Sequence, residues 1–249
     1  MEILSKKLVV GIDVDEVLRA KWFQFDKHYI EEFGEEGTPK GNPYVFDYFE
    51  AYKFNDTVET EKELKEPEDM PPDINPLDYQ HDEKLGEAPA DIFLFKAPVE
   101  TKLTARQVYN RFVNQDFLFE IFGAAPMMYR NMDVQVNKFL EQYQNNVEFT
   151  IVSVENKFTI PPTLFFLSKI SMRFKNVRFV DKALDMWNHV DILVTSNPEI
   201  LKGGAPWGKK LIKITRPYNE AINVGSVEVK QVAELIDNKK FEKIIKYKK

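Results

Sequence analysis

The chain has 249 residues, no cysteine and a formal net charge of −6 at pH 7. Without cysteine it can form no disulfide bond and has no thiol nucleophile, and a chain of this length buries enough surface to fold without a metal. The opening residues, MEILSKKLVVGID, lack the long apolar core of a signal peptide, and no stretch approaches the roughly 18 apolar residues of a membrane span. We therefore expect a soluble, intracellular protein without a membrane partner.

The charge is unevenly distributed along the chain. Residues 56–91 contain 13 acidic residues, three lysines and five prolines, so this segment carries −10 and the rest of the chain +4. Such an acidic, proline-rich segment cannot form a core of its own. The last twelve residues, 238–249, contain six lysines and one glutamate. We interpret this basic tail as solubilising and expect no nucleic-acid partner.

The first half of the chain predicts one strand and three helices. Residues 8–13 (LVVGID) form a continuous apolar run that predicts a buried strand. Apolar residues at helical spacing predict helices over 16–33, 104–122 and 133–143.

In the second half, strand and helix patterns alternate. The strand patterns cover residues 147–154, 177–180, 191–195 and 211–215. The helix or turn patterns cover residues 163–174, 182–188 and 228–247. Strands that alternate with helices favour a parallel, doubly wound sheet, so the predicted fold class is α/β with a Rossmann-like core.

The domain prediction places a core at residues 1–33 plus 130–249 and an insertion at residues 34–129. The insertion contains the acidic arm 56–91, and just before that arm a group of aromatic residues. We expect these aromatic residues to form an interface, because aromatic side chains are enriched where proteins meet. They are Tyr44, Phe46, Tyr48, Phe49, Tyr52 and Phe54. Protein partners are therefore expected to bind through residues 34–100.

Two aspartates, Asp13 and Asp15, follow the first predicted strand. Ligands of open α/β sheets bind at the carboxyl ends of the strands, and the alternation of an extended backbone sends both side chains the same way. Two carboxylates that close repel each other unless a proton or a cation lies between them, and Mg²⁺ is the natural cation for oxygen ligands. Taken alone, the pattern is equally compatible with one aspartate that caps a helix and another at the surface.

The motif GIDVDEVLR, which contains both aspartates, resembles the nucleophile motif of the haloacid-dehalogenase-like (HAD-like) phosphatase superfamily. The strand that ends in FTIVS delivers Ser153, and VRFVDKALDMWNHVDILV contains Lys182 just ahead of the next core strand, as in that family. The resemblance implies that Asp13 is the nucleophile, that Asp15 is the general acid and base, and that Ser153 and Lys182 bind the phosphoryl group. It also implies Mg²⁺ as the cofactor.

The stretches DILVTSNPEIL and KKLIKITRPYN are similar to the 5′-nucleotidase-like branch of this superfamily in bacteria and phages. The resemblance covers roughly residues 7–33 and 130–237. It implies a HAD-like core in which the insertion takes the position of the family's cap.

One family motif is missing. The fourth motif places one or two acids after DILV, where this chain has Thr195 and Ser196. In the family those acids complete the magnesium site, so here Asp13 and Asp15 would hold Mg²⁺ with two neutral hydroxyls, which are weak ligands. The possible replacement acids are Asp181, Asp185 and Glu199.

The residue after the two aspartates also departs from the family. Glu16 stands where the family often has glycine. An acidic side chain beside the site is expected to repel a phosphate.

Two functions are compatible with these residues. The first is a non-catalytic HAD-like protein (a pseudoenzyme) that serves as an interaction or structural component of a larger assembly, such as a phage virion. The alternative is a magnesium-dependent phosphatase of the 5′-nucleotidase type, which would act on nucleotide monophosphates through a phospho-aspartate. A regulatory module that binds a nucleotide or phosphate ester without turnover is a third interpretation.

Overall fold

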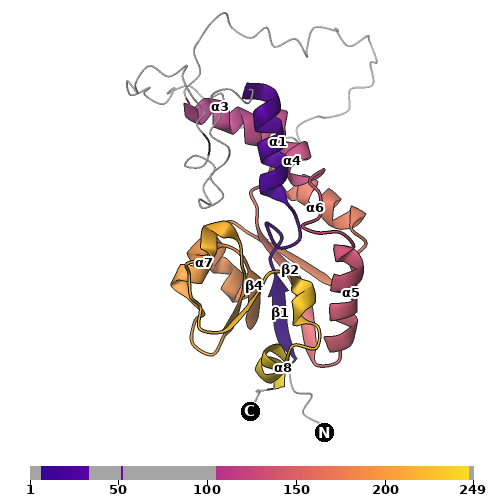
Figure 1. Cartoon of the computed structure of the whole chain (residues 1–249). Helices are drawn as coiled ribbons and strands as arrows, with labels where there is room; N and C mark the ends of the chain where they lie inside the picture. The colour runs from indigo at the N-terminus through magenta and orange to yellow at the C-terminus, as the bar shows by residue number, and fades with distance from the viewer. Residues whose placement is uncertain (1–6, 34–51, 53–104, 247–249) are drawn as a thin grey trace, which may run out of the picture. The chain divides into compact units, whose positions relative to one another are not determined.

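The structure is a computed structural model, and it describes residues 7–33, 52 and 105–246 (Figure 1). The chain divides into two compact units, Met1–Lys53 with Tyr109–Lys249, and Phe54–Val108. The sheet and the candidate site belong to the first unit. The acidic arm lies outside the described residues, as do five of the six predicted interface aromatics, namely Tyr44, Phe46, Tyr48, Phe49 and Phe54.

The first unit is built on a six-stranded sheet in which all neighbouring strands are parallel. The strand order is β3-β2-β1-β4-β5-β6. The strands are β1 (Leu8–Ile12), β2 (Val147–Val154), β3 (Asn176–Val180), β4 (Ile192–Thr195), β5 (Lys210–Ile214) and β6 (Val227–Val229). The chain runs outward from β1 through β2 and β3 and then returns to β4 on the other side of β1. The predicted α/β class with a doubly wound parallel sheet is confirmed, and the point where the strand order reverses lies beside β1.

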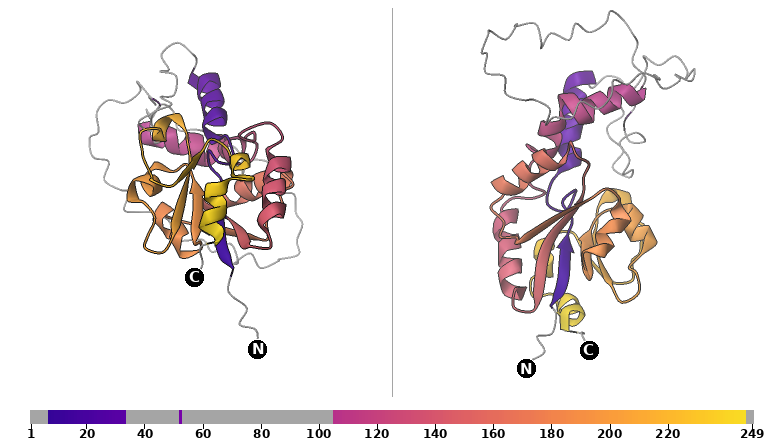
Figure 2. Two further views of the ribbon diagram at one scale, coloured as in Figure 1. Left: turned by 60° about the horizontal axis from the view of Figure 1, so that its bottom comes forward. Right: turned by 180° about the vertical axis from the view of Figure 1, so that it is seen from behind.

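Helices cover both faces of this sheet, as two views of the ribbon show (Figure 2). On one face, buried side chains of β1, β2, β4, β5 and β6 pack against four helical elements. These are α5 (Met132–Tyr143), α6 (Ile160–Lys169), η4 (Val232–Leu235) and α8 (Lys239–Lys246). On the other face the packing elements are η2 (Ala183–Asn188) and α7 (Pro198–Gly203). Since successive side chains of a strand face opposite ways, the central strands β1, β2, β4 and β5 contribute to both cores, whereas the edge strand β6 contributes only to the first.

The first helix begins later than its apolar pattern predicted. Helix α1 is Lys21–Phe33, because the residues after β1 form a tight turn instead. In this turn the amides of Val17, Leu18 and Arg19 all donate to the carbonyl oxygen of Val14. Leu18, the apolar residue that suggested an earlier start of the helix, is nevertheless buried.

Two further helices differ from the prediction in their extent. The predicted helix over 104–122 is divided into α3 (Ala105–Arg111), a π-helical turn η1 (Phe112–Asp116) and α4 (Leu118–Phe122). The wider turn is closed by the amide of Phe117, which donates to the carbonyl oxygen of Phe112 at 3.1 Å. The predicted helix over 163–174 is α6, which begins three residues earlier and ends at Lys169.

The predicted closing helix over 228–247 is confirmed only for its last part, α8. Its first residues form the edge strand β6, and the turn η4 and helix α8 follow. Asp237 has a left-handed backbone (φ 55°) between η4 and α8, which interrupts any continuous helix. Strand β6, turn η4 and helix α8 all contribute apolar side chains to the same core. The spacing of these apolar residues alone therefore did not distinguish a strand from a turn or a helix.

Segment 109–129 belongs to the first unit, although the sequence placed it in the insertion. Phe112 packs against Phe25 of α1 with ring centroids 5.0 Å apart. Tyr52 joins the same cluster, stacked on Trp22 at 5.8 Å, and it is buried. The side chain of Tyr52, predicted at an interface, is therefore used inside the chain. No helix in the described ranges is long and apolar enough to cross a bilayer.

Candidate functional site

A cavity of about 590 Å³ opens at the carboxyl ends of the central strands. It lies beside the point where the strand order reverses, which is where open α/β sheets bind their ligands. The described residues that line it are Asp13, Asp15, Lys21, Val154, Asp181, Lys182, Ala183, Leu184, Asp185, Asn197 and Glu199. Three of the predicted site residues, Asp13, Asp15 and Lys182, are thus brought together, although they are up to 169 positions apart in the sequence.

Asp13 follows β1 directly and its side chain is buried. One carboxylate oxygen accepts a hydrogen bond from the Thr195 hydroxyl at 2.6 Å, and the other accepts from the amide of Val14 at 2.8 Å. Burial raises the pKa of Asp13 to about 7, against the hydrogen bond from Thr195, which lowers it. Burial therefore shifts this carboxyl group towards its protonated form near neutral pH.

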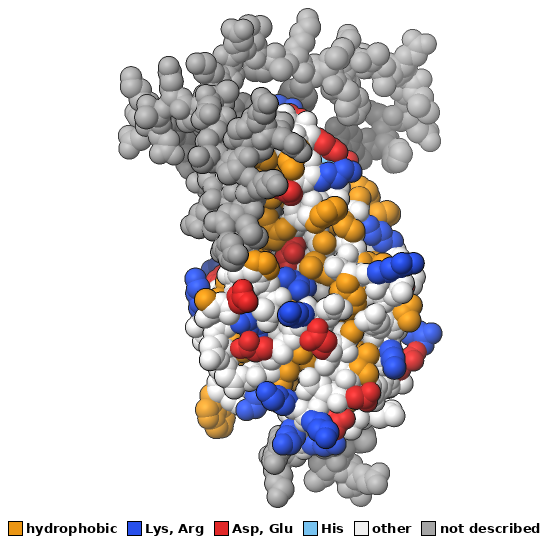
Figure 3. Space-filling model, in the orientation of Figure 1, with side chains coloured by type: hydrophobic (Ala, Val, Ile, Leu, Met, Phe, Trp, Pro, Cys, Tyr) orange, Lys and Arg blue, Asp and Glu red, His pale blue; other side chains and the backbone are white. Residues whose placement is uncertain are grey.

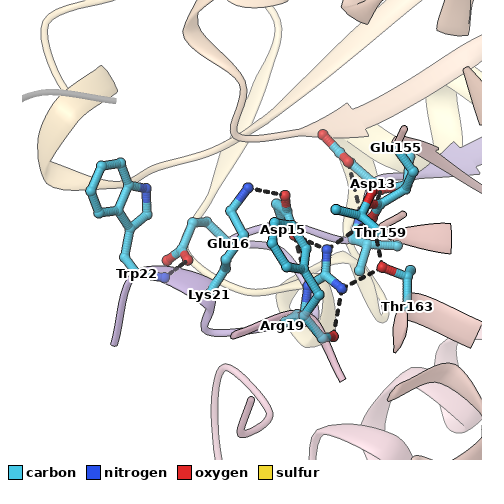
Figure 4. Close-up of polar contacts among 12 residues, drawn as sticks. Asp13, Asp15, Glu16, Arg19, Lys21, Trp22, Glu155, Thr159 and Thr163 are labelled. Carbon is cyan, nitrogen blue, oxygen red and sulfur yellow. Dashed lines mark hydrogen bonds and ion pairs between the residues drawn. The ribbon is translucent and has the colours of Figure 1, made fainter. Parts of the chain in front are cut away.

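Asp15 lies between two cations (Figure 4). Its Oδ1 atom accepts from Nε of Arg19 at 2.8 Å and also from Nη2, while its Oδ2 atom accepts from Nζ of Lys21. Burial alone would raise the pKa of Asp15, but the charges and hydrogen bonds of Arg19 and Lys21 outweigh it, and the pKa is lowered. Asp15 is therefore held as a carboxylate.

Arg19 is fully buried and connects four segments of the chain. Besides Asp15, its guanidinium donates to the carbonyl oxygen of Phe122 at 2.7 Å, to the Thr163 hydroxyl at 2.6 Å and to Oε1 of Glu155 at 2.9 Å. The loop after β1, the end of α4, the end of β2 and helix α6 thus meet at one side chain (Figure 4). A guanidinium offers five N–H donors in a fixed plane, which suits such a junction.

Ser153 belongs to the network around Arg19, and it is not among the described residues that line the cavity. Its hydroxyl is buried and donates to Oε1 of Glu155 at 3.0 Å. The cause is the alternation of β2: Val154 faces the cavity, so Ser153 and Glu155 face α6 on the other side. The structure therefore does not bring the predicted phosphoryl-binding hydroxyl into the cavity.

Thr195 and Ser196, which stand where the resemblance in sequence implies acids, have hydroxyls that already have partners. The Thr195 hydroxyl donates to Asp13, as described above, and the Ser196 hydroxyl donates to the carbonyl oxygen of Asp15 at 3.1 Å. Tyr218 in turn donates to the Ser196 hydroxyl at 2.9 Å. Both side chains therefore tie β4 to the loop after β1.

The possible replacement acids Asp181, Asp185 and Glu199 all line the cavity. Asp191, at the opposite end of β4, accepts from the amide of Val9 at 2.8 Å, so it lies away from the site. These acids do not form a metal site with one another. In the described part of the chain, no group of three or more His, Cys, Asp or Glu side chains is placed to hold a metal ion.

The residues of the site do not fit a Mg²⁺ ion. Mg²⁺ needs oxygen ligands in near-octahedral geometry, usually from one or two carboxylates. Here all four carboxylate oxygens of Asp13 and Asp15 already accept hydrogen bonds, and two of those oxygens face Arg19 and Lys21. A divalent ion that binds Asp15 would have to displace Lys21 from Oδ2 or Arg19 from Oδ1.

Glu16 lies outside the cavity lining, so the expected repulsion of a phosphate is not supported by its position. Its side chain caps helix α1, because its Oε1 atom accepts from the amide of Trp22 at 2.8 Å. Its backbone is left-handed, with φ 57°, which is the reason that glycine suits this position. Burial raises the pKa of Glu16 to about 7, against the hydrogen bond from Trp22, which lowers it.

Sequence reasoning missed the four residues that decide the electrostatics of this site, Arg19, Lys21, Glu155 and Thr163. Two signals were present. Arg19 and Lys21 are cations four and six positions after Asp15, and Glu155 is a carboxylate that follows an apolar strand directly. The pairing of these charges needed the fold, because Arg19 and Glu155 are 136 residues apart.

No protein-family model matches the chain, and no curated protein was found to match it.

Proposed function

We propose that the chain is a non-catalytic member of the HAD-like superfamily, related to its 5′-nucleotidase-like branch, and that it works by binding a partner protein in a larger assembly. The resemblance in sequence is supported by the site. Asp13 and Asp15 follow the central strand of a parallel doubly wound sheet, and Lys182 lines the same cavity.

The observation that carries the non-catalytic half of the proposal is the position of Asp15 between Arg19 and Lys21. A phospho-aspartate mechanism needs an ionised nucleophile and an acid that can give up a proton near neutral pH. In this chain the expected nucleophile, Asp13, has the raised pKa and the expected acid, Asp15, has the lowered one. Burial thus disfavours ionisation of the expected nucleophile, while Arg19 and Lys21 disfavour protonation of the expected acid.

The missing acids weaken phosphoryl transfer further. Phosphoryl transfer depends on positioning and on stabilisation of charge by cations. Hard divalent cations are bound through carboxylate charge and number, so a site without these acids holds such a cation less well. Thr195 and Ser196 supply no negative charge for a divalent ion.

The binding half of the proposal is supported by apolar side chains exposed around α4 and α6. Phe119 of α4 is 47% exposed and Phe165 of α6 is 45% exposed, and their rings contact each other with centroids 4.8 Å apart. Leu164, next to Phe165, and Phe158, just ahead of α6, are also exposed. Apolar side chains gather over this part of the surface in the space-filling view (Figure 3). Aromatic residues are enriched at protein interfaces; placing the assembly in a phage virion rests on the resemblance alone.

Turnover assays test the first half. Purified full-length chain is incubated with Mg²⁺ and either p-nitrophenyl phosphate or a set of nucleoside monophosphates, and phosphate release is measured beside the Asp13→Asn variant. We expect the two proteins to give the same background rate. Magnesium-dependent release that disappears in Asp13→Asn would overturn the proposal.

Affinity capture tests the second half. The full-length chain and the variant Phe119→Asp/Phe165→Asp are used to capture proteins from extracts of cells that express the chain. We expect a partner that the wild type retains and the variant loses. The matched control is Trp207→Asp, which changes a fully exposed side chain on another segment and should keep the partner. Identical capture by the wild type and the double variant contradicts an interface at α4 and α6.

The alternative function, a magnesium-dependent phosphatase acting on nucleotide monophosphates, is favoured by one observation. Asp13, Asp15 and Lys182 line a single cavity of about 590 Å³, a volume typical of small-molecule sites. The turnover assay above decides between the two functions.

A further inference from the structure

We infer that Arg19 and Lys21 are resident cations that take the place of the divalent ion, so that the carboxylate pair of this chain is complete without a metal. The inference rests on the proposed family resemblance, which is what raises the expectation of a metal here. It concerns metal binding, whereas the proposed function concerns turnover.

The first argument is the occupation of the carboxylate oxygens. In the pair Asp13 and Asp15, two oxygens accept from neutral donors, Thr195 and the amide of Val14. The two oxygens of Asp15 accept from Arg19 and Lys21, one oxygen from each cation. Every oxygen that would bind a metal therefore has a donor from this chain.

The second argument is charge. Asp15 and Glu155 carry two negative charges, and Arg19 and Lys21 carry two positive charges. This buried cluster is neutral as it stands. A divalent ion added beside it would place two further positive charges next to Arg19 and Lys21, which repel it.

The third argument is that Arg19 cannot leave its place without loss. Displacing it would deprive Glu155, Thr163 and the carbonyl oxygen of Phe122 of a donor at once. Buried polar groups without partners are costly, and breaking a buried ion pair is more costly still. Arg19 also joins segments from four parts of the chain, a role that a bound metal plays in other proteins.

Lys21 is the more accessible of the two cations. Its side chain lines the cavity and is 12% exposed, whereas that of Arg19 is not exposed at all. Its ammonium group lies 5.4 Å from the ring centre of Phe122, which contributes a cation–π contact. Replacing Lys21 should therefore release Oδ2 of Asp15 towards the cavity while the Arg19 network stays intact.

The experiment is a Mg²⁺ titration of the full-length chain by isothermal calorimetry, with thermal unfolding measured in parallel. For the wild type we expect no saturable heat and no change in Tm up to millimolar Mg²⁺. Lys21→Met should gain a Mg²⁺-dependent rise in Tm, because a ligand that binds the folded state stabilises it. The second change Asp15→Asn should remove that gain, and Lys182→Met, which alters another cavity lysine, should show none.

The inference is overturned if the wild type binds Mg²⁺ saturably and Asp15→Asn abolishes the binding. This holds even if the wild type has no phosphatase activity, in which case the proposed function survives. It is also overturned if folded Lys21→Met gains no response to Mg²⁺. Turnover by a wild type that binds no Mg²⁺ would instead remove the proposed function and leave this inference in place. The wild-type titration decides the matter even if Lys21→Met fails to fold.

Discussion

Replacing Arg19 with methionine should destabilise the folded chain strongly, because it removes the only cation that the structure places against Glu155 among the described residues. Methionine is unbranched and of similar length, so the change removes the charge, the hydrogen bonds and the cation–π contacts with the rings of Phe122 and Phe166 without removing the bulk of the side chain. Glu155 would remain buried without a counterion.

The size of the effect follows from burial. Neither side chain of the Arg19–Glu155 pair is exposed. Removing one partner of a buried pair costs about 3–5 kcal/mol, which is a large part of the roughly 5–15 kcal/mol by which proteins of this kind are stable. We expect a loss of about 4 kcal/mol in the free energy of unfolding.

The assay is urea unfolding followed by circular dichroism at pH 7. Arg173→Met is the matched control, because Arg173 pairs with Glu141 at 2.6 Å but both side chains are more than half exposed. Exposed pairs contribute about 0–1 kcal/mol, so this control should unfold almost like the wild type. The double variant Arg19→Met/Glu155→Gln should recover part of the loss, since it removes the uncompensated charge. A loss below about 1 kcal/mol in Arg19→Met would refute the reasoning.

Three further predictions concern the loop after β1 and the strand itself. Glu16→Ala should be less stable than Glu16→Gly by about 1 kcal/mol in urea unfolding, because both lose the cap on Trp22 and only alanine keeps the strain of a positive φ; equal stabilities would show that the turn relaxes. Gly11→Ala should cost about 1–3 kcal/mol, since the added Cβ would lie 2.4 Å from a Val190 methyl, and Val190→Ala in the same chain should restore most of the loss. Asp13→Asn should gain stability relative to the wild type as the pH rises from about 4 to 7. A raised folded pKa means that the folded state binds more protons than the unfolded state in this window. The wild type therefore loses stability there through both Asp13 and Glu16, and the variant through Glu16 alone; parallel pH profiles for the two proteins would contradict the raised pKa of Asp13.

The fold was predictable because its signals are local and redundant. The apolar runs of β1, β2 and β4 are unbroken, and their alternation with helical patterns predicts a parallel sheet without knowledge of any contact. The edge strand β6 was missed because a three-residue strand is shorter than the window in which a period can be recognised. The helix predicted there fitted the same apolar residues.

The candidate site was predictable only in part. The approach of Asp13, Asp15 and Lys182 to one cavity follows from the order of the strands. The partners of those residues do not follow from it, because a carboxylate that binds a metal and one that binds an arginine look alike in a sequence. Ser153 is a second example of what the sequence could not predict. Its place at the end of β2 was predicted, but the face of the sheet on which its side chain lies depends on the register of that strand.

The junction at Arg19 also bears on how the chain folds. Its partners Asp15, Phe122, Glu155 and Thr163 are separated by up to 148 positions, so the junction can form only after long loops have closed. Contacts of this kind are expected to be absent from the transition state and to form on its native side. Arg19 would then stabilise the native state but not the transition state, and its loss would increase the unfolding rate constant far more than it decreases the refolding rate constant.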